Sequence, residues 1–89
     1  MKKHLIISGK VQGVGFRNWL YMKAIDKNIS GWVKNTKAGE VEAVLIGEDE
    51  DVSEIIKKCQ IGPSISHVTK VKIQDYQQDY FNKSFDIVK

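Results

Sequence analysis

Residues 9–17 carry the groups best suited to chemistry in this chain of 89 residues. The segment reads GKVQGVGFR and joins an apolar, strand-like stretch to a helix-like one. Its small residues allow consecutive backbone N–H groups to converge on one anion, and the start of a following helix adds free N–H groups and positive potential. The segment ends in Arg17, the only arginine among 14 basic residues. Because a guanidinium offers paired donors that match a phosphate group, we predict an anion-binding site here.

The predicted site is built mainly from backbone, and a simpler interpretation of the segment exists. Spacing alone also fits a tight turn followed by an ion-paired surface arginine, since the third glycine of a dinucleotide fingerprint and the Gly-Lys-Ser/Thr of a P-loop are both missing. At 100° per residue, however, Arg17 is the one charge on the apolar half of the predicted helix, where a charge needs a partner such as a bound phosphate. The N–H groups expected to contact the anion belong to Gln12, Gly13, Val14, Gly15, Phe16 and Arg17.

Asn35 is a second candidate, because it ends a predicted strand just before a hairpin connection at 36–39. Functional side chains are common in loops and at the ends of strands. An asparagine also suits a turn for conformational reasons. Its type and place therefore leave two interpretations, a functional amide or a turn former.

The elements that must position these residues predict an α+β fold. Period-two and continuous apolar stretches indicate strands, and spacings of three and four residues indicate helices. The predicted order is a strand at 4–8, a helix from 16 to near Asn28, strands at 31–35 and 40–46, a second helix carrying Val52, Ile55, Ile56 and Cys59, a strand at 68–73, a polar loop or strand extension at 74–83, and a short last strand at 84–89. This order suits two interleaved βαβ units, with two helices on one face of a mainly antiparallel sheet.

The first predicted helix carries Arg17, so we predict which of its residues face the core and where it ends. Its expected core-facing half consists of Phe16, Leu20 and Ala24 together with Arg17, Tyr21 and Ile25. Trp19 falls off this stripe, which leaves it either at the rim of the site or exposed. Asparagine is the second choice after glycine for the left-handed residue that closes a helix, so Asn28 marks the expected end.

Composition limits the classes of protein that this chain can represent. With 42% hydrophobic and 28% charged residues, it matches an ordinary globular mixture, and its length suits a single domain spanning residues 1–89. The single cysteine excludes an internal disulfide and any multi-cysteine zinc site. The apolar run 5–7 is too short for a signal sequence or membrane span, so the expected compartment is the cytoplasm. Residues 1–45 carry a net charge of +5 (eight basic, three acidic) and residues 46–89 carry −2 (six basic, eight acidic), so the first half favours an anionic partner.

The combination of motifs resembles the acylphosphatase family over almost the whole chain. The resemblance rests on Gly9–Arg17, on Gly31-Trp32-Val33-Lys34-Asn35, and on Gly39–Ala43, Gly47 and Gly62-Pro63. It implies a ferredoxin-like sandwich with an extra short C-terminal strand, which hydrolyses the carboxyl–phosphate bond of acyl phosphates without a metal or other cofactor. It also implies that Arg17 and Asn35 occupy the catalytic positions.

The chemistry of an acyl phosphate agrees with so small a set of groups. The leaving carboxylate has a conjugate acid with a pKa of about 4, so it departs without a strong general acid. Phosphoryl transfer then needs chiefly positioning and charge stabilisation. We expect the loop N–H groups and Arg17 to hold the phosphoryl oxygens and Asn35 to place the attacking water, with the phosphate itself accepting the proton. The expected partner is a small acyl phosphate bound by a monomer, with no nucleic acid and no membrane.

Other reactive side chains fit structural roles better. His4 and His67 lack a neighbouring cysteine or carboxylate pattern, and Cys59 lies on the apolar stripe of the second helix. The acidic run 48–51 suits the positive end of that helix better than a divalent cation.

Two alternatives from other functional classes remain. An RNA-recognition module has the same βαββαβ order, and residues 12–19 faintly echo its glycine-aromatic signature, although that signature belongs on an internal strand. An accessory domain that binds acyl phosphates without turnover is the other alternative.

Overall fold

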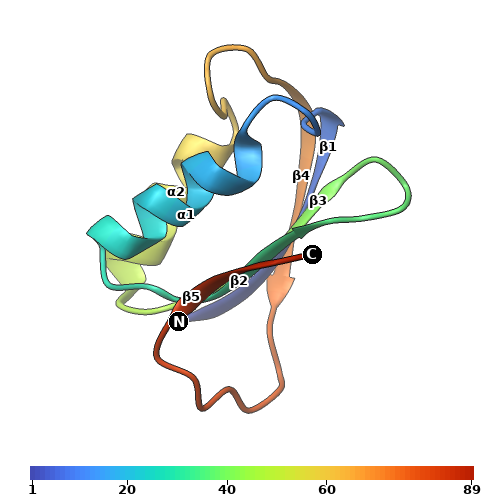
Figure 1. The fold of residues 1–89 in the computed structure, drawn as a ribbon. Coiled ribbons are helices and arrows are strands. Elements are labelled where there is room, and N and C mark those ends of the chain that lie inside the picture. Colours follow the sequence, from blue (N-terminus) through green and yellow to red (C-terminus); the bar gives the residue numbers. More distant parts are fainter.

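The computed structural model describes residues 1–89 as two helices packed on one face of a five-stranded sheet (Figure 1). The elements in chain order are β1 (Lys2–Lys10), α1 (Phe16–Asp26), β2 (Ser30–Asn35), β3 (Val41–Ile46), α2 (Asp49–Cys59), β4 (His67–Asp75) and β5 (Phe85–Val88). Every predicted element is present. The first and fourth strands are longer than the sequence pattern indicated, because β1 and β4 pair with each other along nearly their whole length.

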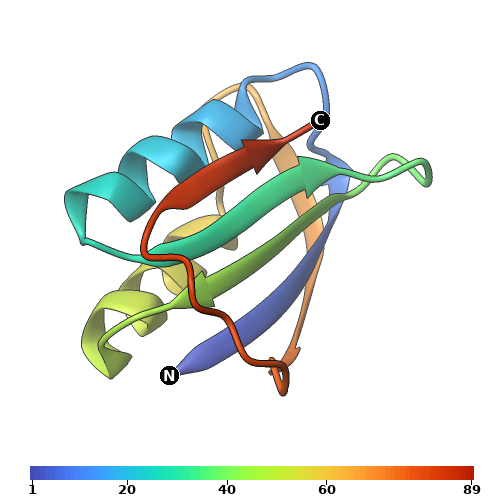
Figure 2. The same cartoon turned by 60° about the horizontal axis from the view of Figure 1, so that its bottom comes forward.

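The strands lie in the order β4-β1-β3-β2-β5 (Figure 2). The pairs β1–β3, β1–β4 and β2–β3 are antiparallel, and only the edge pair β2–β5 is parallel. The predicted α+β, ferredoxin-like class with an added C-terminal strand is therefore confirmed. This topology brings β5, which is last in the chain, beside β2, the strand that ends at Asn35.

The core lies between the helices and the sheet. Period-two alternation turns Leu5 and Ile7 of β1 and Val41, Ala43 and Leu45 of β3 toward the helices, and all five are fully buried. The helices complete this core with the buried residues Phe16, Leu20, Ala24, Val52, Ile55 and Cys59. Burial of these side chains fixes the position of α1 over the sheet, and with it the position of the loop that precedes α1.

The buried stripe of α1 is narrower than predicted. Phe16, Leu20 and Ala24 are buried, but Ile25 is 49% exposed, so its placement on the core-facing half was wrong. The helix has neighbours only on its sheet and α2 sides, and Ile25 falls outside both. The predicted end at Asn28 is confirmed: Asn28 has a φ of 56°, and the N–H groups of Asn28 and Ile29 donate to the carbonyls of Ile25 and Ala24. This is the Schellman arrangement that closes a helix.

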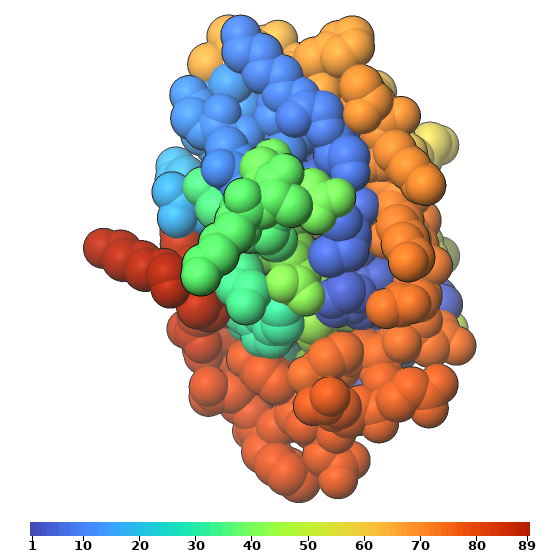
Figure 3. Space-filling model, turned by 90° about the vertical axis from the view of Figure 1, so that its right-hand side faces the viewer, coloured from blue at the N-terminus to red at the C-terminus, as the bar shows by residue number.

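The segment 76–84 crosses the face of the sheet that the helices leave open (Figure 3). The hydroxyl of Tyr80 donates to the carbonyl of Gly31 at 3.1 Å, and the N–H of Tyr76 donates to the carbonyl of Lys2. Val44, on this face of β3, is fully buried. The segment therefore closes the end of the sheet where β2 begins, and leaves free the opposite end, where Asn35 and the loop 11–15 lie.

Candidate active site

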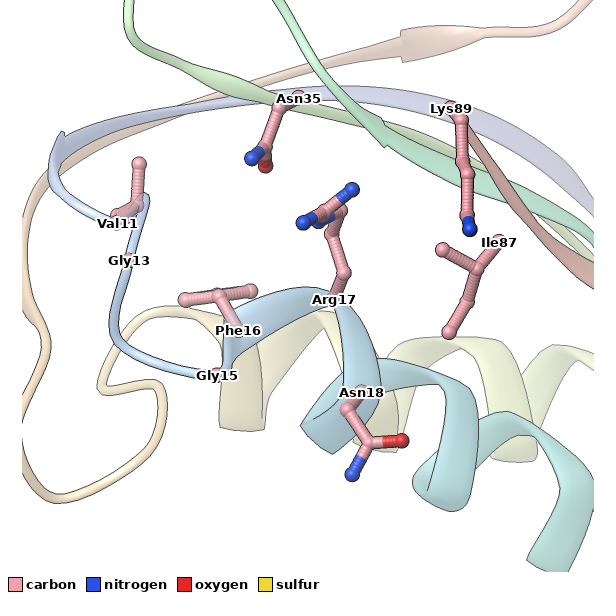
Figure 4. A pocket seen from close by; sticks show the side chains of 9 residues that line it. All are labelled: Val11, Gly13, Gly15, Phe16, Arg17, Asn18, Asn35, Ile87 and Lys89. Carbon is pink, nitrogen blue, oxygen red and sulfur yellow. The ribbon is translucent and has the colours of Figure 1, made fainter.

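A pocket of about 230 Å³ opens between the start of α1 and the ends of β2 and β5. Figure 4 shows the side chains that surround it, with Arg17 rising from α1 and Asn35 pointing toward it from β2. The pocket is lined by Val11, Gly13, Gly15, Phe16, Arg17, Asn18, Asn35, Ile87 and Lys89. The two residues that the sequence singled out for chemistry thus face one pocket, although 18 positions separate them along the chain.

The loop before α1 is held by its apolar residues and shaped by its glycines. Val11 is fully buried and Val14 nearly so, which anchors the loop at two points. Gly13 and Gly15 have φ values of 73° and 77°, in the left-handed region that favours glycine. Gly15 is the N-cap of α1, so the chain enters the helix without a side-chain cap.

The loop presents unpaired N–H groups, as the sequence predicted. No backbone N–H from Val11 to Asn18 donates to another backbone carbonyl. The N–H groups of residues 16–18 belong to the first turn of α1, where a helix has no internal acceptors. The free donors and the helix dipole together make the mouth of the pocket favourable for an anion.

Gln12 and Val14 do not line the pocket, although both belong to the predicted set of N–H donors. The side chain of Gln12 has a different partner: its Nε2 donates to the carbonyls of Thr36 and Glu40, both at 2.8 Å. These two bonds tie the loop to the β2–β3 connection, directly after Asn35. Gln12 thereby couples the position of the loop to the position of Asn35.

Arg17 makes no ion pair within the protein. None of the six salt bridges includes it, and its side chain is only half buried. The alternative of an ion-paired surface arginine is therefore wrong. The guanidinium is instead one of the walls of the pocket, with its donors available to a ligand.

Asn35 carries an unused acceptor. Its Oδ1 is buried and has no hydrogen-bond partner. A buried polar atom left unpaired costs about 1–3 kcal/mol, so such atoms usually have a functional or solvent partner. A plain turn former would have no need to aim its amide at Arg17.

Lys89 and Ile87 are site residues that sequence reasoning missed. In the β2–β5 register, Gly31 pairs with Phe85 and Val33 with Ile87. The same alternation, continued by one step, turns Asn35 and Lys89 to the helix side, and both line the pocket. The period-two pattern of Phe85, Ile87 and Lys89 was available as a signal, but its meaning depends on the pairing of β5 with β2.

The remaining reactive side chains lie outside this pocket. His4 contacts Glu42 at 2.7 Å on the open face of the sheet, and His67 is exposed on β4. Burial raises the pKa of the Cys59 thiol to about 12, which makes it a poor nucleophile at neutral pH. The structure has no cluster of three or more metal-ligating His, Cys, Asp or Glu side chains. Neither helix is long and apolar enough to cross a membrane.

Trp19, whose role the sequence left open, is half buried beside the site. Its ring packs edge-on against Phe16, with ring centroids 5.2 Å apart. Residues 12–19 lie on the loop and the first turn of α1 rather than on a strand. The resemblance of this segment to an RNA-binding signature therefore has no structural counterpart.

Comparison with known proteins agrees with this geometry. The sequence model of the family described as acylphosphatase matches residues 3–87. The chain belongs to the acylphosphatase family. An acylphosphatase of Rhodopseudomonas palustris is 46% identical over 80 residues, which cover 90% of this chain and 81% of the relative. An acylphosphatase of Chlorobaculum tepidum is 40% identical over 85 residues, which cover 96% and 92% of the two chains.

A solved acylphosphatase has nearly the same fold. The crystal structure of the acylphosphatase from Bacillus subtilis superposes with a TM-score of 0.93 at 31% identity, covering 99% of this chain and 98% of that one. The family inferred from the two motifs is thereby confirmed. As a member of the acylphosphatase family, the chain is a hydrolase acting on acyl phosphates.

Proposed function

We propose that the pocket between α1, β2 and β5 hydrolyses acyl phosphates to a carboxylate and inorganic phosphate, without a metal ion. The observation that carries this proposal is the meeting of three unsatisfied features in one pocket. They are the unpaired N–H groups of the loop, the guanidinium of Arg17 without an ion pair, and the buried Oδ1 of Asn35. Each lacks a partner within the protein. A bound phosphoryl group together with its attacking water would provide a partner for all three.

The loop and Arg17 hold the phosphoryl group. The N–H groups of Gly13, Gly15, Phe16 and Arg17 donate to its oxygens, and the two-pronged guanidinium neutralises charge on them. Charge on the equatorial oxygens changes as the group passes through its transition state, and fixed donors stabilise it without reorganisation. Gln12 and Val14, which the sequence also predicted as N–H donors, contribute through the position of the loop backbone that their side chains anchor.

Asn35 positions the water. Its Oδ1 accepts a hydrogen bond from the water, which directs an oxygen lone pair toward phosphorus. The new P–O bond forms as the bond from phosphorus to the acyl oxygen breaks, and that electron pair leaves on the carboxylate. A phosphoryl oxygen takes the proton of the water. No protein group changes its protonation state, so the reaction needs no general base.

The proposal also includes the oligomeric state, the partner and the compartment of the protein. We expect a monomer as the active form, because Arg17 and Asn35 already face one pocket within a single chain. The pocket is the size of a small ligand rather than a polymer, so we expect an acyl phosphate partner and no nucleic acid. A buried free thiol at Cys59 suits a reducing compartment such as the cytoplasm.

An assay in EDTA tests the proposed reaction. Benzoyl, acetyl and carbamoyl phosphate should all release inorganic phosphate, because the pocket binds mainly the group they share. Phenyl phosphate, a monoester with a far poorer leaving group, should be hydrolysed slowly or not at all. Turnover of the monoester at a comparable rate would overturn the substrate class, and loss of all turnover in EDTA would overturn the metal-free mechanism.

A further inference from the structure

A second hollow, of about 600 Å³, runs along the exposed side of α1 and adjoins the catalytic pocket. We call it the α1 hollow. Gly15 and Asn18 line both depressions, so the two meet at the first turn of α1. The residues that line the α1 hollow are Gly15, Asn18, Trp19, Met22, Lys23, Ile25 and Asp26.

Beyond Gly15 and Asn18, the α1 hollow carries exposed apolar side chains. Met22 is 60% exposed and Ile25 49%, although both are large apolar side chains. Trp19 lines the same hollow, and its indole contacts two neighbouring side chains. Phe16 packs against it at 5.2 Å, and the Nζ of Lys23 lies 5.9 Å from its ring centroid. An aromatic surface that is fixed before binding loses little conformational entropy when a ligand packs on it.

The geometry of the reaction indicates where the acyl group would leave the pocket. In an in-line displacement, the leaving group departs on the side of phosphorus opposite the attacking water. In Figure 4, Asn35 approaches Arg17 from β2, whereas Gly15 and Asn18 lie at the start of α1. An acyl group that leaves on the side away from Asn35 would pass the first turn of α1, where the α1 hollow begins.

We propose that the α1 hollow is the acyl subsite, and that Trp19 and Met22 favour acyl phosphates with apolar or aromatic acyl groups. This inference rests on the proposed function, and it adds a substrate preference that the phosphate-binding groups do not provide. A benzoyl group would place its ring against Trp19 and Met22. An acetyl group is too short to reach Met22, so its binding depends on the phosphate site alone.

The experiment compares two non-hydrolysable analogues, phenacylphosphonate for benzoyl phosphate and acetonylphosphonate for acetyl phosphate. Calorimetry gives the Kd of each for the parent protein and for Met22→Gln, a polar replacement of similar length at an exposed position. The parent should bind phenacylphosphonate about tenfold more tightly than acetonylphosphonate. Met22→Gln should weaken phenacylphosphonate about threefold and leave acetonylphosphonate unchanged, and the KM values of the two acyl phosphates should shift in the same pattern.

Phe81→Gln is the matched control, because Phe81 is 89% exposed and lies in the segment 76–84, at the other end of the sheet. It should change neither Kd. Equal affinity of the parent for the two analogues, or an equal effect of Met22→Gln on both, would overturn the acyl subsite while acetyl phosphate turnover still supports the proposed function. Failure of the parent to hydrolyse either acyl phosphate would instead overturn the proposed function, and the subsite with it.

Discussion

The two helices of this protein begin in opposite ways. The first turn of α2 contains Asp49, Glu50 and Asp51, whose carboxylates interact favourably with the positive end of the helix dipole. The first turn of α1 contains no acidic residue, and its only charged residue is Arg17, while neither helix has a side-chain cap. Both helices have 11 residues and pack on the same sheet, so the difference does not come from the fold.

This difference between the first turns of α1 and α2 indicates which helix start has positive potential available to an anionic ligand. At α2 three carboxylates of the first turn offset the positive end of the dipole, and no residue of α2 lines the candidate site. At α1 the free N–H groups and the guanidinium remain unpaired, and Asn35 faces them from β2. The stability of α1 therefore depends on its buried residues Phe16, Leu20 and Ala24 and on the closure at Asn28, rather than on its first turn.

The largest expected effect concerns Cys59, the one thiol in the chain, which lies on α2. Burial raises its pKa from 9.0 to about 12. At pH 8 its thiolate fraction should be about a thousandfold lower than that of an exposed thiol, since each pKa unit is tenfold. Native protein should therefore react with Ellman's reagent at least that much more slowly than protein unfolded in urea. Rapid labelling of native protein would contradict the assignment of Cys59 to the core.

The same pKa has a consequence for stability. The folded state keeps its thiol proton to higher pH than the unfolded state, which loses it near pH 9. The free energy of unfolding should therefore fall as the pH rises from about 9 toward 12. A Cys59→Ala variant, measured over the same range, separates this contribution from that of the lysines.

Asn35→Ala removes the side chain that we propose positions the attacking water beside the anion site at α1. Loss of one such transition-state hydrogen bond lowers kcat by about two to three orders of magnitude. The affinity for inorganic phosphate should stay within about twofold, because the loop and Arg17 are intact. Kinetics and phosphate calorimetry on this one variant distinguish a water-positioning role of Asn35 from a role as a turn former. Near-parental turnover by a variant with a lower melting temperature would make Asn35 a turn former.

Arg17→Lys keeps the charge at the start of α1 and removes the two-pronged geometry. Hydrogen bonds to charged groups contribute about 1.5–3 kcal/mol, so phosphate affinity should fall about tenfold to a hundredfold. The fold should survive, because Arg17 makes no ion pair within the protein. The protection that phosphate gives against thermal unfolding should shrink accordingly. A variant that binds phosphate as the parent does would remove Arg17 from the site.

Asn18→Asp gives the first turn of α1 an acidic side chain, as the first turn of α2 already has. A carboxylate in the first turn stabilises a helix by about 0.3–1 kcal/mol, so the free energy of unfolding should rise. The same charge repels phosphate, and the phosphate affinity should fall severalfold. Glu50→Gln in α2 is the reciprocal control: it should cost about 0.3–1 kcal/mol of stability and leave turnover unchanged. Unchanged phosphate affinity in Asn18→Asp would show that α1 does not attract the anion.

Much of this site could be predicted because its information is local. The glycines at 13 and 15, the placement of Arg17 in the first turn, and the helix closure at Asn28 all follow from short-range conformational rules. Lys89 could not be placed in the same way, because only the parallel pairing of β2 with β5 brings it beside Asn35. That pairing joins segments more than 50 residues apart, and no local rule specifies it.

Two other features depended on tertiary contacts in the same way. Ile25 matches the apolar stripe of α1 but is exposed, because no element covers that part of the helix. Val44 lies on the face of β3 away from the helices, yet it is fully buried, on the face that Tyr80 of the segment 76–84 also contacts at Gly31. In each case burial depends on whether a distant segment covers the position, which the local pattern does not specify.

The most direct test of the account is hydrolysis of benzoyl phosphate in water enriched in ¹⁸O. The central claim is that a water positioned by Asn35 attacks the phosphorus atom held by the loop and Arg17. Mass spectrometry of the products should then find one ¹⁸O in inorganic phosphate and none in benzoate. Incorporation of ¹⁸O into benzoate would mean attack at the carbonyl carbon, and it would contradict the roles assigned to Arg17 and Asn35.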